Sequence, residues 1–122
     1  MIKSIFIIED ESIIALMLQR FLSSHNYNIL GIAKEGAKAI ELIRTLTPDL
    51  IIMDVNIQGD INGVDTFKII KSFSDVPVIF LTGNSVEIIN NEKMCQGIPI
   101  LEKPVSLEDM KKTIDKILGE NN

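Results

Sequence analysis

The chain has 122 residues, of which 46% are hydrophobic and 24% charged, and its formal net charge is −5. These proportions are typical of one folded globular domain and exclude an intrinsically disordered chain. The acidic excess argues against nucleic acid as a direct partner, because no surplus of Lys and Arg is available to neutralise phosphates. The single cysteine, Cys95, excludes an internal disulfide and suits a reducing cytoplasm, where we expect the protein. The apolar run after Met1 stops at Ile8, which is too short for a membrane-spanning helix.

Short apolar segments alternate with amphipathic helical patterns along the chain. The apolar segments are short, rich in Ile and Val, and bounded by Gly, Pro, Asn or Asp, which favours strands. In chain order, the predicted strands are residues 4–8, 27–33, 50–53, 76–82 and 98–103. The stripes at helical spacing between and after them are Ile14, Met17, Leu18, Phe21 and Leu22; Ala39, Ile43 and Leu46; Val64, Phe67, Ile70 and Phe73; and Leu107, Met110, Ile114 and Ile117.

Two further features complete the prediction of helices. A helix near residues 85–95 has the weakest pattern, since Asn90 and Asn91 interrupt it. Ser106 with Asp109 three residues later is similar to a capping box and predicts where the last helix begins. Five strands alternating with five helices predict an α/β fold, with a parallel sheet covered on both faces. No linker or repeat interrupts the pattern, so we expect residues 1–122 to form a single domain.

Polar side chains stand where four of the predicted strands end. Ligands of open α/β sheets bind beyond the carboxyl ends of the strands, so these residues should converge on one edge. They are Glu9, Asp10 and Glu11 after the first strand, Asp54 after the third, Thr82 after the fourth and Lys103 after the fifth. For Glu11 alone we expect an ordinary solvated position at the start of a helix, where acidic residues suit the helix dipole.

The carboxylates predicted at the carboxyl edge of the sheet would lie close together and would need a cation to neutralise them. Two unit charges about 4 Å apart repel by about 4 kcal/mol at an effective dielectric constant of about 20. An all-oxygen ligand set suits Mg²⁺, with Mn²⁺ as a possible substitute. Lys103 and Thr82 would supply the other contacts that a phosphoryl group requires. A carboxylate such as Asp54 can itself accept the phosphoryl group as an aspartyl phosphate.

Four segments in this order, "IFIIEDE", "LIIMDVN", "VIFLTG" and "ILEKP", resemble the signature segments of the response-regulator receiver domain. The resemblance extends from Lys3 to about Leu118. It implies a five-stranded flavodoxin-like fold, doubly wound in three α/β/α layers, with strand order 2-1-3-4-5. It also implies a phosphorelay function, in which a phosphoryl group passes from a phosphohistidine to Asp54 and switches protein–protein contacts.

The resemblance also implies a role for each site residue. Asp10 and Asp54 would bind Mg²⁺ directly, the backbone carbonyl of Asn56 would be a third ligand, Glu9 would act through water, and Thr82 and Lys103 would contact the phosphoryl oxygens. The Lys103–Pro104 bond resembles one that is usually cis in the family. The implied partners are a sensor histidine kinase or phosphotransfer protein and a downstream protein target. We expect no nucleic acid or membrane contact, and a monomer or weak homodimer.

The chain departs from the family pattern at three places. The loop after Asp54, residues 57–63, looks one residue longer than the common form, and Gly83 follows the threonine at the end of the fourth strand. Ile100 stands where the family commonly has an aromatic residue that turns inward on activation. We therefore expect the output to run through rearrangement of loops and of the fourth helix.

Two other functions are compatible with parts of this pattern. A phosphohydrolase of the haloacid-dehalogenase type also uses an aspartate nucleophile, a Thr or Ser and a Lys. In this chain, however, the companion acids precede Asp54, and Asn56 stands where such enzymes need a second aspartate. A degenerate receiver would keep only protein interactions, but the set of Asp10, Asp54, Thr82 and Lys103 is intact. Both a free-standing regulator and a fragment of a longer hybrid kinase or regulator fit the sequence.

Overall fold

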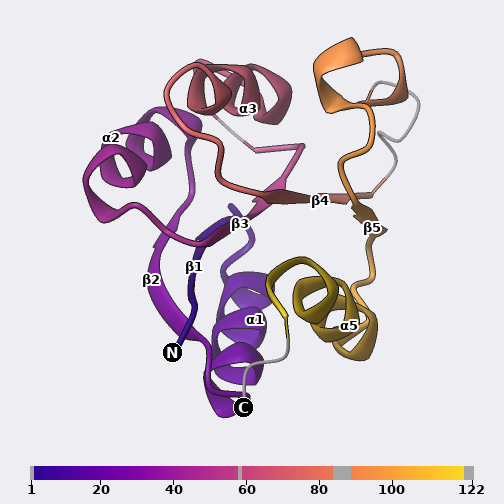
Figure 1. Cartoon of the computed structure of the whole chain (residues 1–122). Helices are drawn as coiled ribbons and strands as arrows, with labels where there is room; N and C mark the ends of the chain where they lie inside the picture. The colour runs from indigo at the N-terminus through magenta and orange to yellow at the C-terminus, as the bar shows by residue number, and fades with distance from the viewer. Residues whose placement is uncertain (1, 58, 84–88, 120–122) are drawn as a thin grey trace.

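The computed structural model describes residues 2–57, 59–83 and 89–119 (Figure 1). Its five strands form one parallel sheet in the order β2-β1-β3-β4-β5, which confirms the predicted fold. The strands are β1 (Ser4–Ile8), β2 (Asn28–Ala33), β3 (Leu50–Asp54), β4 (Val78–Thr82) and β5 (Ile100–Glu102). The helices are α1 (Ser12–Ser24), α2 (Gly36–Leu46), α3 (Gly63–Lys71) and α5 (Leu107–Leu118), with a short 3₁₀ helix at Lys93–Cys95.

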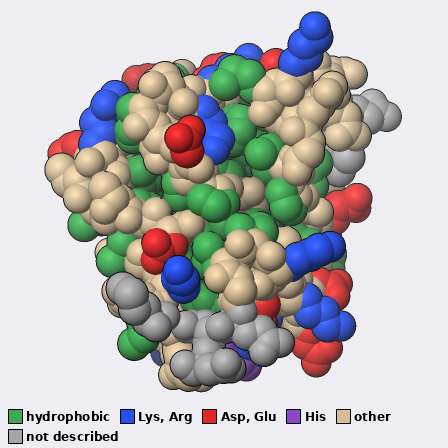
Figure 2. Space-filling model, viewed as in Figure 1, with side chains coloured by type: hydrophobic (Ala, Val, Ile, Leu, Met, Phe, Trp, Pro, Cys, Tyr) green, Lys and Arg blue, Asp and Glu red, His purple; other side chains and the backbone are tan. Residues whose placement is uncertain are grey.

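The helices cover the sheet in two layers, with α2 and α3 on one face and α1 and α5 on the other (Figure 1). Successive strand residues point to opposite faces, so each strand contributes to two hydrophobic clusters. In β1, Phe6 and Ile8 pack beneath α2 and α3, whereas Ile5 and Ile7 pack against α1 and α5. This two-sided burial explains why the strand segments are almost continuously apolar. Figure 2 shows hydrophobic side chains between the helix layers, with most charged side chains around the perimeter of the viewed face.

The fourth and fifth strands begin later than predicted, because each predicted range contains a proline near its start. Pro77 precedes β4 and Pro99 precedes β5, and neither has an N–H group to donate to a neighbouring strand. Each still joins the sheet through its carbonyl. Pro77 accepts from the amide of Ile51 at 3.0 Å, and Pro99 accepts from the amide of Phe80 at 2.9 Å.

The helix stripes of α1 and α2 are buried at their centres and partly exposed at two positions. Leu18 and Leu22 are buried, but Met17 of the same stripe is 37% exposed. Leu46, at the end of α2, is also 37% exposed. The predicted helix near 85–95 lies partly outside the described residues, since 84–88 are not described; within its described part, the short 3₁₀ helix ends at Cys95.

The start of α5 follows the sequence prediction. The Ser106 side chain accepts a hydrogen bond from the amide of Asp109 at 3.3 Å, which satisfies a donor that the first turn leaves without an intrahelical partner. Within the described ranges, no helix combines the length and apolar character that a bilayer crossing requires.

The register of the sheet brings the strand ends to a common edge. Ile8 of β1 pairs with Met53 of β3, so the residues that follow these two positions lie side by side. On the other side of β3, Asp54 pairs with Leu81 of β4. The amide of Lys103 donates to the carbonyl of Thr82 at 2.8 Å, which holds the end of β5 against the end of β4. The carboxyl edge of the sheet therefore contains every strand-end side chain singled out in the sequence.

Candidate functional site

A lysine at the carboxyl edge of the sheet is surrounded by three carboxylates. The Nζ atom of Lys103 lies 2.9 Å from Oδ2 of Asp54, 2.9 Å from Oε1 of Glu9 and 2.6 Å from Oε2 of Glu11. The Lys103 side chain is only 15% exposed. Although burial alone would lower the pKa of Lys103, its contacts with the carboxylates of Glu11, Asp54 and Glu9 raise the pKa above its usual value. The ammonium is therefore firmly charged.

Glu9 is the most deeply buried acid of the site. It has no solvent exposure, and its Oε2 atom accepts a hydrogen bond from the amide of Glu11 at 3.1 Å. Burial, reinforced by the neighbouring Asp54, raises the pKa of Glu9 to about 7, and contacts with Lys103 and the Glu11 amide offset only part of this rise. Among the described residues, no group makes a well-aligned hydrogen bond to Oε1 of Glu9. This buried oxygen can therefore accept a further polar or cationic partner.

Asp54 is held by contacts to both of its carboxylate oxygens. Its side chain is 2% exposed, Oδ2 contacts Lys103, and Oδ1 accepts a hydrogen bond from the amide of Asn56 at 2.9 Å.

Gly63, the first residue of α3, packs closely against the main chain at the end of β3. A Cβ atom at Gly63 would lie 2.5 Å from the carbonyl oxygen of Val55 and 2.8 Å from that of Asp54, so only glycine fits this close approach.

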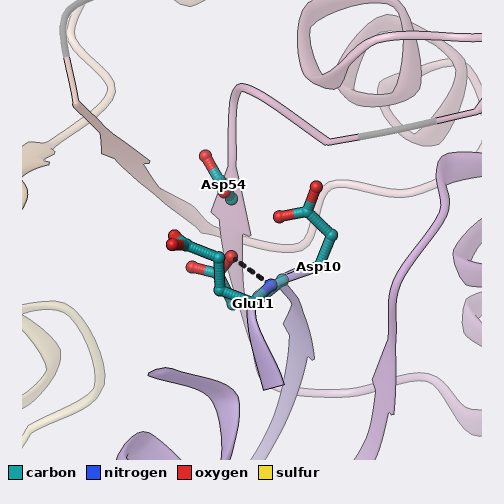
Figure 3. Close-up of side chains that lie close together, drawn as sticks. Asp10, Glu11 and Asp54 are labelled. Carbon is teal, nitrogen blue, oxygen red and sulfur yellow. Dashed lines mark hydrogen bonds between the residues drawn. The ribbon is translucent and has the colours of Figure 1, made fainter. Parts of the chain in front are cut away.

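Asp10 completes a set of four acids. One carboxylate oxygen from each of Glu9, Asp10, Glu11 and Asp54 can be chosen so that all four atoms lie within 4.8 Å of one another. Figure 3 shows Asp10 and Glu11 on opposite sides of Asp54 in the view drawn. Asp10 also borders an open hollow beside the start of α2. Clustered oxygen donors with a single lysine among them fit a hard divalent cation such as Mg²⁺.

Two other strand ends adjoin this cluster. Thr82 is fully buried at the end of β4, where its carbonyl accepts from the amide of Lys103. The Lys103–Pro104 peptide bond is cis, as the family resemblance implies. Ile100 begins β5 opposite Phe80 and packs half-buried against the hydrophobic cluster under α2 and α3. The proposed consequence of an aliphatic side chain at this position for switching stays a prediction.

The prediction for Glu11 as a merely solvated helix-start residue is wrong. Its side chain is 58% exposed, yet its carboxylate forms the shortest of the three ion pairs with Lys103. The two residues are 92 positions apart in the sequence. They meet because β1 and β5 are parallel strands of the same sheet, so their carboxyl ends lie at the same edge. An acid directly after a strand-end pair of acids is the sequence signal that could have indicated this contact.

Known proteins share both the sequence pattern and the fold. The family model of the response regulator receiver domain matches residues 5–115. The transcriptional regulatory protein PdtaR of Mycobacterium tuberculosis is 32% identical over 109 residues, which are 88% of this chain and 53% of PdtaR. The phyllosphere-induced regulator PhyR of Methylorubrum extorquens is 29% identical over 94 residues, which are 76% of this chain and 35% of PhyR. The chain thus spans about half the length, or less, of these curated relatives.

Solved structures give the same comparison at the level of the fold. The signal receiver domain of a modulated diguanylate cyclase from Desulfovibrio desulfuricans superposes with a TM-score of 0.88 at 27% identity, covering 97% of this chain and 94% of that one. The receiver domain of PhyR from Erythrobacter litoralis superposes with a TM-score of 0.87 at 27% identity, covering 99% and 93%.

Proposed function

The chain belongs to the response regulator receiver domain family of two-component signalling, and we propose that it is a phosphoaccepting switch whose acceptor is Asp54. The observation that carries the proposal is the pairing of a buried carboxylate with a firmly charged lysine at the carboxyl edge, Asp54 Oδ2 to Lys103 Nζ at 2.9 Å. A buried acid in this setting has the cation that a developing phosphoryl charge would need.

Mg²⁺ is the proposed cofactor, and Mn²⁺ could replace it. Asp10 and Asp54 would hold it directly, Asn56 through its backbone carbonyl, and Glu9 through water. When bound, the cation would neutralise the acid cluster and the negative charge of an incoming phosphoryl group. The four carboxylate oxygens within 4.8 Å of one another and the buried Oε1 atom of Glu9 support this assignment.

The side chains of the site would then have separate tasks in the transfer. A carboxylate oxygen of Asp54 attacks the phosphorus atom of a phosphohistidine. As the new O–P bond forms, the P–N bond breaks and its electron pair returns to the imidazole nitrogen. The hydrogen bond from the Asn56 amide fixes the orientation of the Asp54 carboxylate. Lys103 and the hydroxyl of Thr82 contact the phosphoryl oxygens, and water later attacks the phosphorus to release phosphate and restore Asp54.

The protein would be a switch and not a turnover enzyme, since it catalyses only its own phosphorylation and dephosphorylation. We propose one receiver domain over residues 1–122, with its core at about 3–118, in the cytoplasm. Its phosphodonor would be a sensor histidine kinase or phosphotransfer protein, and its output a contact with a further protein. We propose a monomer or weak homodimer, without direct nucleic acid or membrane contact.

The proposal is tested by incubation with acetyl phosphate, with and without Mg²⁺, followed by intact-mass measurement. The wild type should gain one phosphoryl group only with Mg²⁺, and Asp54→Asn should gain none. Asp60→Asn, which removes an exposed acid from the loop after β3, is the matched control and should be labelled like the wild type. A wild type without labelling would instead favour the phosphorylation-independent interaction module.

A further inference from the structure

Lys103 is enclosed by carboxylates within the site: it donates hydrogen bonds to Glu11 and Asp54, and Oε1 of Glu9 lies 2.9 Å from its Nζ atom. An ammonium group has three N–H donors, and three carboxylates lie within 3 Å of this one: those of Glu9, Glu11 and Asp54. A phosphoryl oxygen that approaches Lys103 therefore competes with these carboxylates for the ammonium group. The carboxylates that hold Lys103 in place therefore also restrict its access to a phosphoryl group.

The three carboxylates differ in how easily they can leave. Glu9 is fully buried and tied to the Glu11 amide, and Asp54 is 2% exposed and tied to the Asn56 amide. The Glu11 side chain is 58% exposed and can turn into water without leaving a buried charge. The exposed carboxylate of Glu11 also adds a negative charge close to Asp54, and this charge repels an anionic phosphodonor (Figure 3).

We propose that Glu11 is a positioning residue that competes with the phosphodonor for Lys103 and so restrains phosphorylation of Asp54. In the resting protein its carboxylate occupies the outer side of the ammonium at 2.6 Å. The incoming phosphoryl oxygen displaces this carboxylate. Lys103 stays protonated throughout, and its contact with Glu11 is replaced by a contact with the phosphoryl oxygen. This inference rests on the proposed function of Asp54 as the acceptor.

The competition predicts a dependence on the charge of the donor. Glu11→Gln removes one negative charge while keeping the length of the side chain. At saturating Mg²⁺, we expect it to accelerate labelling by acetyl phosphate, a dianion near neutral pH, roughly three- to tenfold. The acceleration should be smaller with phosphoramidate, which carries less negative charge, and should decrease as salt is added. Glu11→Asp, which keeps the charge, should remain closer to the wild type.

The matched control is Glu102→Gln, which makes the same change in net charge at an exposed β5 position next to Lys103. Labelling rates would be measured by intact mass for wild type and the three variants with both donors. Faster labelling of Glu11→Gln than of Glu102→Gln, with the larger gain for acetyl phosphate, is the expected result. Labelled wild type with no gain in Glu11→Gln, or an equal gain with both donors, would overturn the inference and leave the proposed function standing. No labelling of either wild type or Glu11→Gln would overturn both.

Discussion

Replacing Lys103 by methionine should destabilise the fold by an amount that depends on pH. The substitution keeps an unbranched side chain but removes the charge that neutralises Glu9 and Asp54, which are 0% and 2% exposed. Their carboxylate oxygens can lie within 4.8 Å of each other. At an effective dielectric constant of about 20, two charges at this distance repel by about 3–4 kcal/mol. Removing one partner of a buried ion pair typically costs about 3–5 kcal/mol, so at pH 8 we expect a loss of about 3 kcal/mol.

Protonation of Glu9 limits this loss at lower pH. Glu9 starts from an ordinary pKa of 4.5, and the folded protein already raises it to about 7. Keeping the acid protonated in the variant costs about 1.4 kcal/mol per pH unit above 4.5, hence about 5 kcal/mol at pH 8 and below about 1 kcal/mol at pH 5. A raised pKa means that the folded state binds more protons than the unfolded one, so stability falls as pH rises above 4.5. The difference from wild type should therefore shrink to about 1–2 kcal/mol at pH 5.

Urea unfolding followed by circular dichroism at pH 5 and pH 8, without divalent cations, would measure this difference. Lys112→Met is the matched control, because Lys112 is an exposed lysine on α5. The control should unfold like the wild type at both pH values, and saturating Mg²⁺ should restore much of the loss in Lys103→Met at pH 8. If Lys103→Met matched Lys112→Met at pH 8, or lost the same stability at both pH values, the assignment of the lysine as the neutralising charge would be wrong.

Three other predictions concern the loop after β3, the metal, and the contacts of Asp115 on α5 with Tyr27 and Lys111. Gly63→Ala should lower the free energy of unfolding by about 1–3 kcal/mol in urea, because its Cβ would overlap the main chain after β3; an unchanged midpoint would contradict this close approach. Mg²⁺ should raise the melting temperature of the wild type and not of Asp10→Asn, and an equal rise in both would remove Asp10 from the metal site. Although burial alone would raise the pKa of Asp115, hydrogen bonds from Lys111 and Tyr27 lower it below 3.8. Asp115→Asn should thus cost about 1 kcal/mol at neutral pH, a difference that disappears as pH falls through that lowered value, and a difference that persists in acid would refute the assignment.

The sequence was sufficient to predict the fold and most members of the site. Parallel strands place their carboxyl ends at one edge, so polar residues directly after apolar runs could be brought together without knowledge of the structure. Asp54 and Lys103, which are 49 positions apart, were predicted as neighbours in this way and form an ion pair. The same reasoning placed Asp10 and Glu9 beside them.

The details that sequence reasoning missed depend on where side chains point. Glu11 is the residue that precedes α1, and its position in the sequence does not indicate whether its carboxylate points into water or toward the fifth strand. Met17 and Leu46 fall on apolar stripes by spacing, but both are partly exposed. The spacing of apolar residues shows which side of a helix faces the core. How many of those residues are fully buried depends on the elements packed against that side.

Reductive trapping would show directly which residue of the protein carries the phosphoryl group. Borohydride reduces an acyl phosphate to an alcohol, so an aspartyl phosphate becomes homoserine, which proteolysis and mass spectrometry can place in the sequence. After treatment with acetyl phosphate and Mg²⁺, we predict homoserine at position 54 of the wild type and none in samples prepared without Mg²⁺. Homoserine at another aspartate, with position 54 unmodified, would contradict the assignment of Asp54 as the phosphoacceptor.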